Sequence, residues 1–208
     1  MSRSGKKAEK QPWIREGTEE MLVDSPVVKV VRQLYRRQDH PEPRTHRFYK
    51  LISPDWCNVI PITESGAVVF VRQFRVGPDQ MTLELPGGII DATDADISAA
   101  ALREMTEETG FTAGPDAQLT SLGWTHPNPA MQGNRCFSFV IGPVRQTHPQ
   151  KLDPGEDIEV VEVPISEIPE RLRNGEISHA LMQTAFFRLA LHAGRDLESS
   201  LREYTCPR

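Results

Sequence analysis

The sequence has no long hydrophobic run, and this absence excludes several classes of protein. None of its 208 residues lies in an apolar stretch of about 18 residues, the length that a membrane span needs. No apolar segment follows the charged N-terminus MSRSGKKAEKQ, as a secretory signal would require. We therefore expect a cytoplasmic protein without a membrane span. The net charge of −5 provides no basic surface for nucleic acid.

Cysteine is scarce, and its placement is uninformative for metal or disulfide chemistry. Cys57, Cys136 and Cys206 are widely spaced, and no CxxC pair occurs. An odd number of distant cysteines fits neither a disulfide framework nor a zinc knuckle. Because Cys57 and Cys136 lie inside apolar, strand-like runs, we expect both thiols to be buried.

The chain is long enough for one medium domain with a small appendage, and its pattern mixes strands with helices. Runs rich in β-branched residues predict strands at 27–37, 46–52, 56–62, 67–74, 81–85, 119–124, 136–142 and 158–164. Helices are predicted at 97–109, at 166–174, and between an N-cap at Ser178 and a C-cap at Gly194. These elements predict an α+β fold, a mixed sheet between helices in an α/β/α sandwich.

Four segments follow from this pattern. We expect a disordered tail over 1–11, a small antiparallel β region over 12–54, the main domain over 55–194, and a C-terminal tail over 195–208.

The helix predicted at 97–109 carries an unusual cluster of acidic side chains. Residues three and four apart share a helix face, so Glu104 stands beside Glu107 and Glu108, with Arg103 one turn from Glu107. Like charges at these spacings repel unless cations neutralise them, and Mg²⁺ or Mn²⁺ prefers carboxylate oxygens. An ordinary solvated helix face remains the alternative.

The segment from Gly88 to Phe111 resembles the Nudix box, G-x5-E-x7-R-E-U-x-E-E-x-G-U, in which U is a bulky apolar residue. The second half matches at Arg103, Glu104, Met105, Glu107, Glu108, Gly110 and Phe111. The first half departs from the pattern. Gly88 is one residue too far from Arg103, and the position of the first glutamate falls on Ala95, between Asp94 and Asp96.

Members of the Nudix family hydrolyse a nucleoside diphosphate linked to another group, with divalent metals held by the helix carboxylates. The resemblance implies Mg²⁺ or Mn²⁺ bound by Glu104, Glu108 and the backbone carbonyl of Gly87. Glu107 would be a further ligand or an orienting carboxylate. Arg103 would hold this catalytic helix face in order through ion pairs.

Three segments outside the box resemble the ADP-ribose and nucleoside-diphosphate-sugar pyrophosphatases. VRQFRVG and LELPGG imply a phosphate or ribose contact for Arg75 and an adenine-side or metal-shell role for Glu84. Pro127, sixteen residues beyond Phe111, matches a mark of this subgroup. Glu156, in the acidic loop DPGEDIEVVEV, matches the loop glutamate that serves as base or metal ligand.

The same subgroup pairs two subunits through an N-terminal sheet, which implies a homodimer in which Trp13 is a candidate to stack on the adenine. We expect a small-molecule nucleotide substrate. Two alternatives stay open: hydrolysis of another nucleotide, such as GDP-mannose or a dinucleoside polyphosphate, and a Nudix module that binds a nucleotide without cleaving it.

Overall fold

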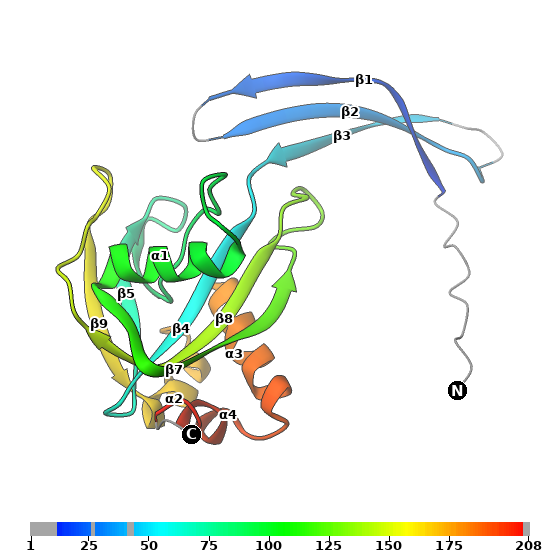
Figure 1. The fold of residues 1–208 in the computed structure, drawn as a ribbon. Coiled ribbons are helices and arrows are strands. Elements are labelled where there is room, and N and C mark those ends of the chain that lie inside the picture. Colours follow the sequence, from blue (N-terminus) through cyan, green and yellow to red (C-terminus); the bar gives the residue numbers. More distant parts are fainter. Residues whose placement is uncertain (1–11, 26–27, 41–43, 206–208) are drawn as a thin grey trace. The chain divides into compact units, whose positions relative to one another are not determined.

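The computed structural model describes residues 12–25, 28–40 and 44–205, which form two compact units (Figure 1). The first unit comprises Met1–Ser53 and Asn128–Gly133, and the second comprises Pro54–Pro127 and Asn134–Arg208. The expected disordered tail over 1–11, and Cys206, lie outside the described residues. Within the described ranges, no helix has the length and apolar character needed to cross a membrane.

The first unit is a three-stranded antiparallel sheet in the order β1-β2-β3. Its strands are β1 (Trp13–Asp24), β2 (Lys29–Arg37) and β3 (Thr45–Ile52). Strands β2 and β3 were predicted, whereas no strand was predicted over β1. The N–H of Leu51 donates to the carbonyl of Met131 at 2.8 Å, which ties the segment Asn128–Gly133 to β3.

The second unit contains a mixed sheet in the order β6-β5-β4-β8-β7, with β9 paired to β5. The strands are β4 (Trp56–Thr63), β5 (Ala67–Arg75), β6 (Gln80–Glu84), β7 (Phe111–Thr125), β8 (Cys136–Gln146) and β9 (Ile158–Pro164). Strands β4 and β8 pair in parallel, whereas the other pairs among these described strands are antiparallel. The predicted mixed sheet is therefore confirmed.

Helices cover both faces of this sheet and create two cores (Figure 1). They are α1 (Ile97–Thr109), α2 (Ile168–Arg173), α3 (Ala180–Ala193) and α4 (Leu197–Arg202), with a short 3-10 helix at Ile165–Glu167 before α2. On the α1 side, Ala101 and Met105 pack against Val59 and Phe137. On the α3 side, Phe186 packs against Phe70. The expected α/β/α sandwich is confirmed.

Three local features differ from the sequence-based expectations. The N-cap of α3 is His179 instead of Ser178, because the His179 ring Nδ1 accepts the Leu181 N–H at 3.1 Å. In the segment expected as a C-terminal tail, α4 buries Leu201 completely in the core. Strand β7 begins at Phe111, well before 119, because a register shift between Ala113 and Gln118 lets its irregular first half stay paired with β8.

The expected burial of Cys57 and Cys136 is confirmed, at 3% and 2% exposure. Burial raises the pKa of each thiol to about 12.

Candidate functional site

Helix α1 is fixed at both ends, and this orients its acidic face. Asp96 caps the N-terminus by accepting the N–H of Ala99 at 2.8 Å. Gly110 ends the helix in the left-handed conformation, with φ of 73°, and a Cβ there would lie 2.1 Å from the carbonyl oxygen of His148. Because Ala101 and Met105 are buried against the sheet, the carboxylates of α1 must point elsewhere.

The glycine pair after β6 lies against β4 and under α1. The N–H of Cys57 donates to the carbonyl of Gly88 at 2.9 Å. A Cβ on Gly87 would lie 2.2 Å from the carbonyl oxygen of Cys57, and one on Gly88 would lie 2.7 Å from the carboxyl carbon of Glu104. Only glycine fits at these two positions without displacing the strand or the carboxylate.

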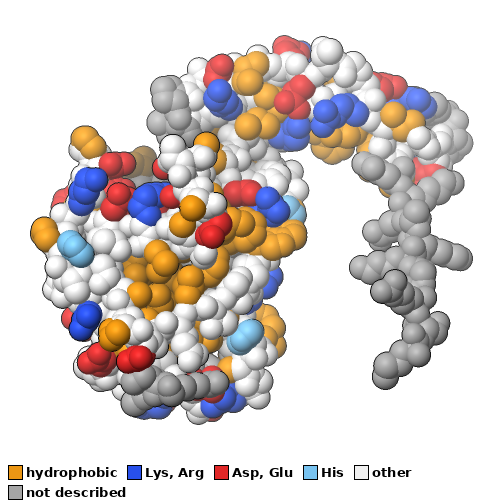
Figure 2. Space-filling model, in the orientation of Figure 1, with side chains coloured by type: hydrophobic (Ala, Val, Ile, Leu, Met, Phe, Trp, Pro, Cys, Tyr) orange, Lys and Arg blue, Asp and Glu red, His pale blue; other side chains and the backbone are white. Residues whose placement is uncertain are grey.

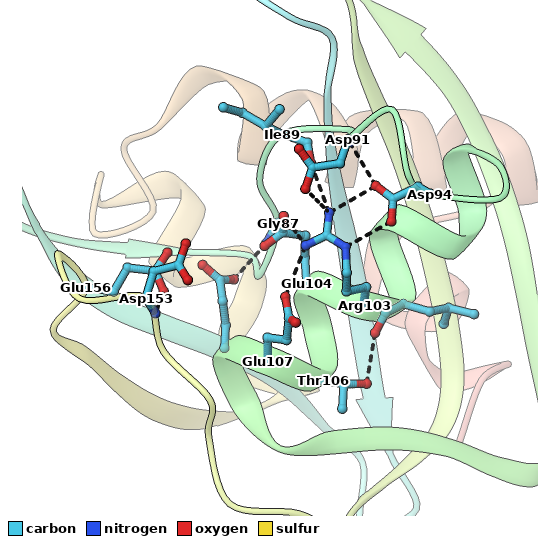
Figure 3. Close-up of polar contacts among 12 residues, drawn as sticks. Gly87, Ile89, Asp91, Asp94, Arg103, Glu104, Thr106, Glu107, Asp153 and Glu156 are labelled. Carbon is cyan, nitrogen blue, oxygen red and sulfur yellow. Dashed lines mark hydrogen bonds and ion pairs between the residues drawn. The ribbon is translucent and has the colours of Figure 1, made fainter. Parts of the chain in front are cut away.

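The side chain of Arg103 is the centre of an ion-pair network, with acidic residues on both sides of it in Figure 3. It donates to both oxygens of Asp94 at 2.9 and 3.0 Å, and to Glu104 and Glu107 at 2.9 and 3.0 Å. A further N–H donates to the carbonyl of Ile89 at 3.1 Å. Such a forked, charge-assisted geometry requires a guanidinium. Arg103 thus ties two α1 carboxylates to the preceding loop.

The two aspartates of that loop have separate roles. Asp94 receives the Arg103 fork and also accepts the N–H of Asp91 at 2.8 Å, with its side chain 7% exposed. Asp96 caps α1 and makes no contact with Arg103 among the hydrogen bonds of the described residues. Of the two aspartates that flank Ala95, Asp94 is therefore the one that contacts Arg103.

Glu108 is the second, less compensated part of the acidic face, and it lies beside Glu104. Glu108 is 4% exposed and accepts the N–H of Gly87 at 2.8 Å. Burial raises the pKa of its carboxyl to about 8, and the nearby charges of Glu104 and Glu156 act in the same direction. Burial also raises the pKa of Glu104. An additional cation beside Glu108 would favour the ionised form of its carboxyl.

Arg75, at the end of β5, is oriented by a fully buried glutamate. Its guanidinium donates to both oxygens of Glu84 at 2.9 and 2.8 Å, and the hydroxyl of Thr82 donates to Glu84 at 2.7 Å. Glu84 is 1% exposed, whereas the Arg75 side chain is 45% exposed. The hydrogen bonds to Glu84 raise the pKa of Arg75, and the charges of Glu108 and Glu156 act in the same direction.

Glu156 approaches the same carboxylates from the loop between β8 and β9. Its backbone and side chain form a tight turn with Asp153, through hydrogen bonds of 2.9 Å in both directions. Figure 3 draws both residues beside the α1 carboxylates. Glu159, three residues further along the chain, instead accepts a hydrogen bond from Arg72 at 3.2 Å.

Two predicted site residues lie outside this cluster of contacts. Pro127 follows β7 at the boundary of the second unit. Trp13 belongs to the first unit, where its ring packs edge-on against His46 and Phe48 at 5.3 Å.

The NUDIX domain profile matches residues 53–182, more than half of the chain. The chain belongs to the Nudix family. It is 30% identical over 149 residues to an uncharacterized Nudix hydrolase of Schizosaccharomyces pombe, covering 68% of this chain and 71% of the relative. It is 27% identical over 128 residues to the ADP-ribose pyrophosphatase of Bacillus subtilis, covering 61% and 67%. The predicted membership of the Nudix hydrolases is confirmed.

A solved structure, titled an ADP compounds hydrolase, shares the fold of this Nudix chain. It has a TM-score of 0.74 at 20% identity and covers 91% of this chain and 100% of its own. The chain spans between 56% and 71% of the length of the first curated relatives that it matches.

The donor set of the Nudix helix suits a hard divalent cation. Glu104 and Glu108 supply carboxylate oxygens beside Gly87 and Gly88, where the lack of Cβ atoms lets the backbone lie close to β4 and to the Glu104 carboxylate. Their raised pKa values mark negative charge that a cation would stabilise. Over the described ranges, no group of three His, Cys, Asp or Glu side chains is arranged to hold a metal ion.

A cavity of about 690 Å³ opens beside the Nudix helix, but it is not the carboxylate site. Its lining includes Leu102, Thr106 and Glu107 of α1, with His148 and Lys151 from the loop after β8. Figure 2 shows an apolar hollow on this face, bordered by charged side chains. Neither Glu104 nor Glu108 lines this cavity. We therefore assign cation binding to the Glu104 and Glu108 carboxylates and not to the cavity.

Proposed function

We propose that this Nudix chain is a metal-dependent pyrophosphohydrolase of ADP-ribose or a related nucleoside-diphosphate sugar. With ADP-ribose, the products would be AMP and ribose 5-phosphate. The observation that carries the proposal is the buried Glu108, which lies beside Glu104 and within the electrostatic influence of Arg75 and Glu156. The name of the Bacillus subtilis relative supports the choice of substrate.

In this proposal Glu104, Glu108 and the backbone carbonyl of Gly87 hold Mg²⁺ or Mn²⁺. Such an ion neutralises phosphate charge and lowers the pKa of a bound water. Arg103 keeps Glu104 and Glu107 in fixed positions through its ion pairs, so the carboxylate face needs little reorganisation on binding.

Arg75 and Glu156 would act on the substrate itself. Arg75 donates to a phosphate or ribose oxygen, and Glu84 with Thr82 positions its guanidinium. Because both oxygens of Glu84 already accept hydrogen bonds, we propose a positioning role for it in place of direct adenine or metal contact. Glu156, on a loop, serves as the base that removes a proton from the attacking water. Pro127 would help to shape the substrate loop.

We also propose that the chain forms a homodimer through its first unit, with Trp13 contributing to the nucleotide site. Exposed apolar residues on this three-stranded sheet support the interface, among them Met21, Leu22, Val23 and Phe48. Light scattering should give twice the mass of the chain. Replacing Phe48 and Leu22 by serine should give a monomer, whereas a monomeric wild type would contradict the interface.

The direct test is phosphate release, after a coupled phosphatase, from a panel of nucleotides with Mg²⁺, with Mn²⁺ and with chelator. The panel includes ADP-ribose, GDP-mannose, UDP-glucose, NADH, diadenosine polyphosphates and nucleoside triphosphates. Metal-dependent release that is fastest from ADP-ribose supports the proposal. Fastest release from GDP-mannose or a diadenosine polyphosphate would reassign the substrate. Silence across the panel, with nucleotides still raising the melting temperature, would favour a binding module.

A further inference from the structure

An exposed indole stands at the edge of the sheet, on the same face as α1. Trp124 lies directly opposite Phe137 in the antiparallel pair of β7 and β8, so both side chains point to one face. That face is the α1 face, because Phe137 belongs to the core cluster that contains Met105. Phe137 is buried, whereas Trp124 remains 43% exposed.

The backbone of this segment is rigidly placed. A register shift between Ser121 and Gly123 marks a bulge, and Gly123 adopts a φ of 85°. Arg188 of α3 donates to the carbonyl of Leu122 at 2.9 Å and also to the carbonyl of Trp124. A Cβ on Gly123 would lie 2.9 Å from the Arg188 guanidinium. The bulge and this arginine together fix the backbone from which the indole projects.

A cation and a second ring complete the arrangement. The guanidinium carbon of Arg135 lies 5.9 Å from the centre of the Trp124 ring and 5.0 Å from that of Phe137. The Arg135 guanidinium donates to the Asp55 carboxylate at 3.1 and 2.6 Å, and the backbone N–H of Arg135 donates to it at 2.7 Å. His126 packs edge-on against Trp124 at 4.9 Å. We call Trp124, His126 and Arg135 the indole platform.

The indole platform lies in the same sheet as the strand that carries the glycine loop of the carboxylate site. The carbonyl of Asp55 accepts the N–H of Ile90, and the loop from Gly87 to Ile90 is thereby tied to the start of β4. Strands β7, β8 and β4 are neighbours in that order, and the loop lies on the far side of β4, so Trp124 lies about 14 Å, or three strand spacings, from this loop. A nucleotide with its pyrophosphate at Glu108 has the reach to place a planar ring there.

We propose that the indole platform binds the base of the nucleotide by stacking it on Trp124. The inference rests on the proposed function, because it takes the ligand of the carboxylate site to be a nucleoside diphosphate derivative. An aromatic face backed by a guanidinium suits any base, since every base offers a π surface. An apolar packing role alone would bury the indole, whereas this one is exposed and held still.

The test compares the two products, because AMP carries a base and ribose 5-phosphate does not. Calorimetric titrations with Mg²⁺ would use wild type, Trp124→Ala, Trp124→Phe and, as matched control, Phe187→Ala, which removes an exposed ring on α3. Trp124→Ala should weaken AMP binding on the order of 10-fold to 100-fold and leave ribose 5-phosphate within about twofold. Trp124→Phe should retain most of the AMP affinity, and Phe187→Ala should match wild type.

Equal losses for both products, or no loss for either, would overturn the stacking proposal. Melting temperatures identify a misfolded variant, in which case Trp124→Phe alone decides through a small, AMP-specific loss. In turnover, Trp124→Ala should raise KM for ADP-ribose with little change in kcat. If the wild type hydrolyses none of the nucleotides, and Trp124→Ala still weakens AMP binding, the proposed function fails and the indole platform stands. If hydrolysis proceeds with an unchanged KM, the platform fails alone.

Discussion

The acidic face of α1 has two parts that differ in how far their negative charges are compensated. Around Arg103 the negative charges are compensated, since Asp94, Glu104 and Glu107 all accept from one guanidinium. Around Glu108, a buried carboxyl has one backbone donor, from Gly87, and acidic neighbours that raise its pKa. The first part is built for stability in the folded chain alone. In the second part, a proton on Glu108 or a cation beside it would remove the uncompensated negative charge.

Glu108→Gln gives the largest expected effect, since it removes the charge that distinguishes the second part. The introduced amide retains the size of the side chain, and its carbonyl oxygen can accept the Gly87 N–H, so folding should persist. We expect turnover to fall on the order of 1000-fold, with an unchanged or higher melting temperature. Phosphate release and thermal melts measure the two effects. Glu159→Gln, on the exposed side of β9, is the matched control, and normal turnover in Glu108→Gln would refute the assignment.

The pH dependence of stability tests the same contrast without any substrate. The Glu108 pKa is raised from 4.5 to about 8, so the folded chain binds a proton more readily than the unfolded chain. The free energy of unfolding should therefore decrease as pH rises from about 4.5 to about 8. Above that range the stabilisation by protonated Glu108 is lost. Urea unfolding in chelator measures this slope. Glu108→Gln should flatten it, and equal slopes in both proteins would contradict the assignment.

Arg103→Lys tests the compensated part. Lysine keeps the charge but cannot donate as a fork to Asp94 while also reaching Glu104 and Glu107. We expect the free energy of unfolding to fall by about 1–3 kcal/mol, with slower turnover. Arg171→Lys is the matched control, because Arg171 also pairs with two glutamates, but these are 50% and 39% exposed, so about 1 kcal/mol or less is expected. Equal losses of unfolding free energy in the two variants would show that the Arg103 network stabilises the fold no more than a surface ion pair does.

The smallest effect separates the two loop aspartates. Asp96→Ala removes only the cap of α1 and should lower the free energy of unfolding by about 1 kcal/mol, with turnover retained. Asp94→Ala should lower stability more and also slow turnover, because it releases Arg103. Chemical denaturation and phosphate release on both variants check this. The reverse ranking would assign the loop role to Asp96.

Elements with strong local signals could be predicted from the sequence, and elements set by pairing could not. Helix α1 was predicted with its observed bounds, because its sequence shows an apolar face and Gly110 follows as the C-cap. Strand β1 was missed, since WIREGTEEMLVD lacks alternation and most of its residues are exposed. The bulges of β7 depend on β8, which no local pattern reports.

The site followed the same rule. The acidic residues of α1 could be identified by their spacing, whereas the choice between Asp94 and Asp96 depended on how the loop folds onto Arg103. No local pattern indicates that both Glu84 oxygens are taken by hydrogen bonds from other side chains. Trp124 and Arg135 are eleven positions apart, and the pairing of β7 with β8 is what brings them together.

The two buried thiols lie on the parallel pair of strands β4 and β8, where Cys57 faces Phe137 and Cys136 faces Trp56 in register. With a pKa of about 12, neither thiol can react with iodoacetamide at neutral pH while the strands stay closed. Their alkylation, followed peptide by peptide in a mass spectrometer, would therefore record how often the centre of the sheet opens. Nucleotide binding at the neighbouring loop should slow that labelling, giving a readout of ligand binding that requires no turnover.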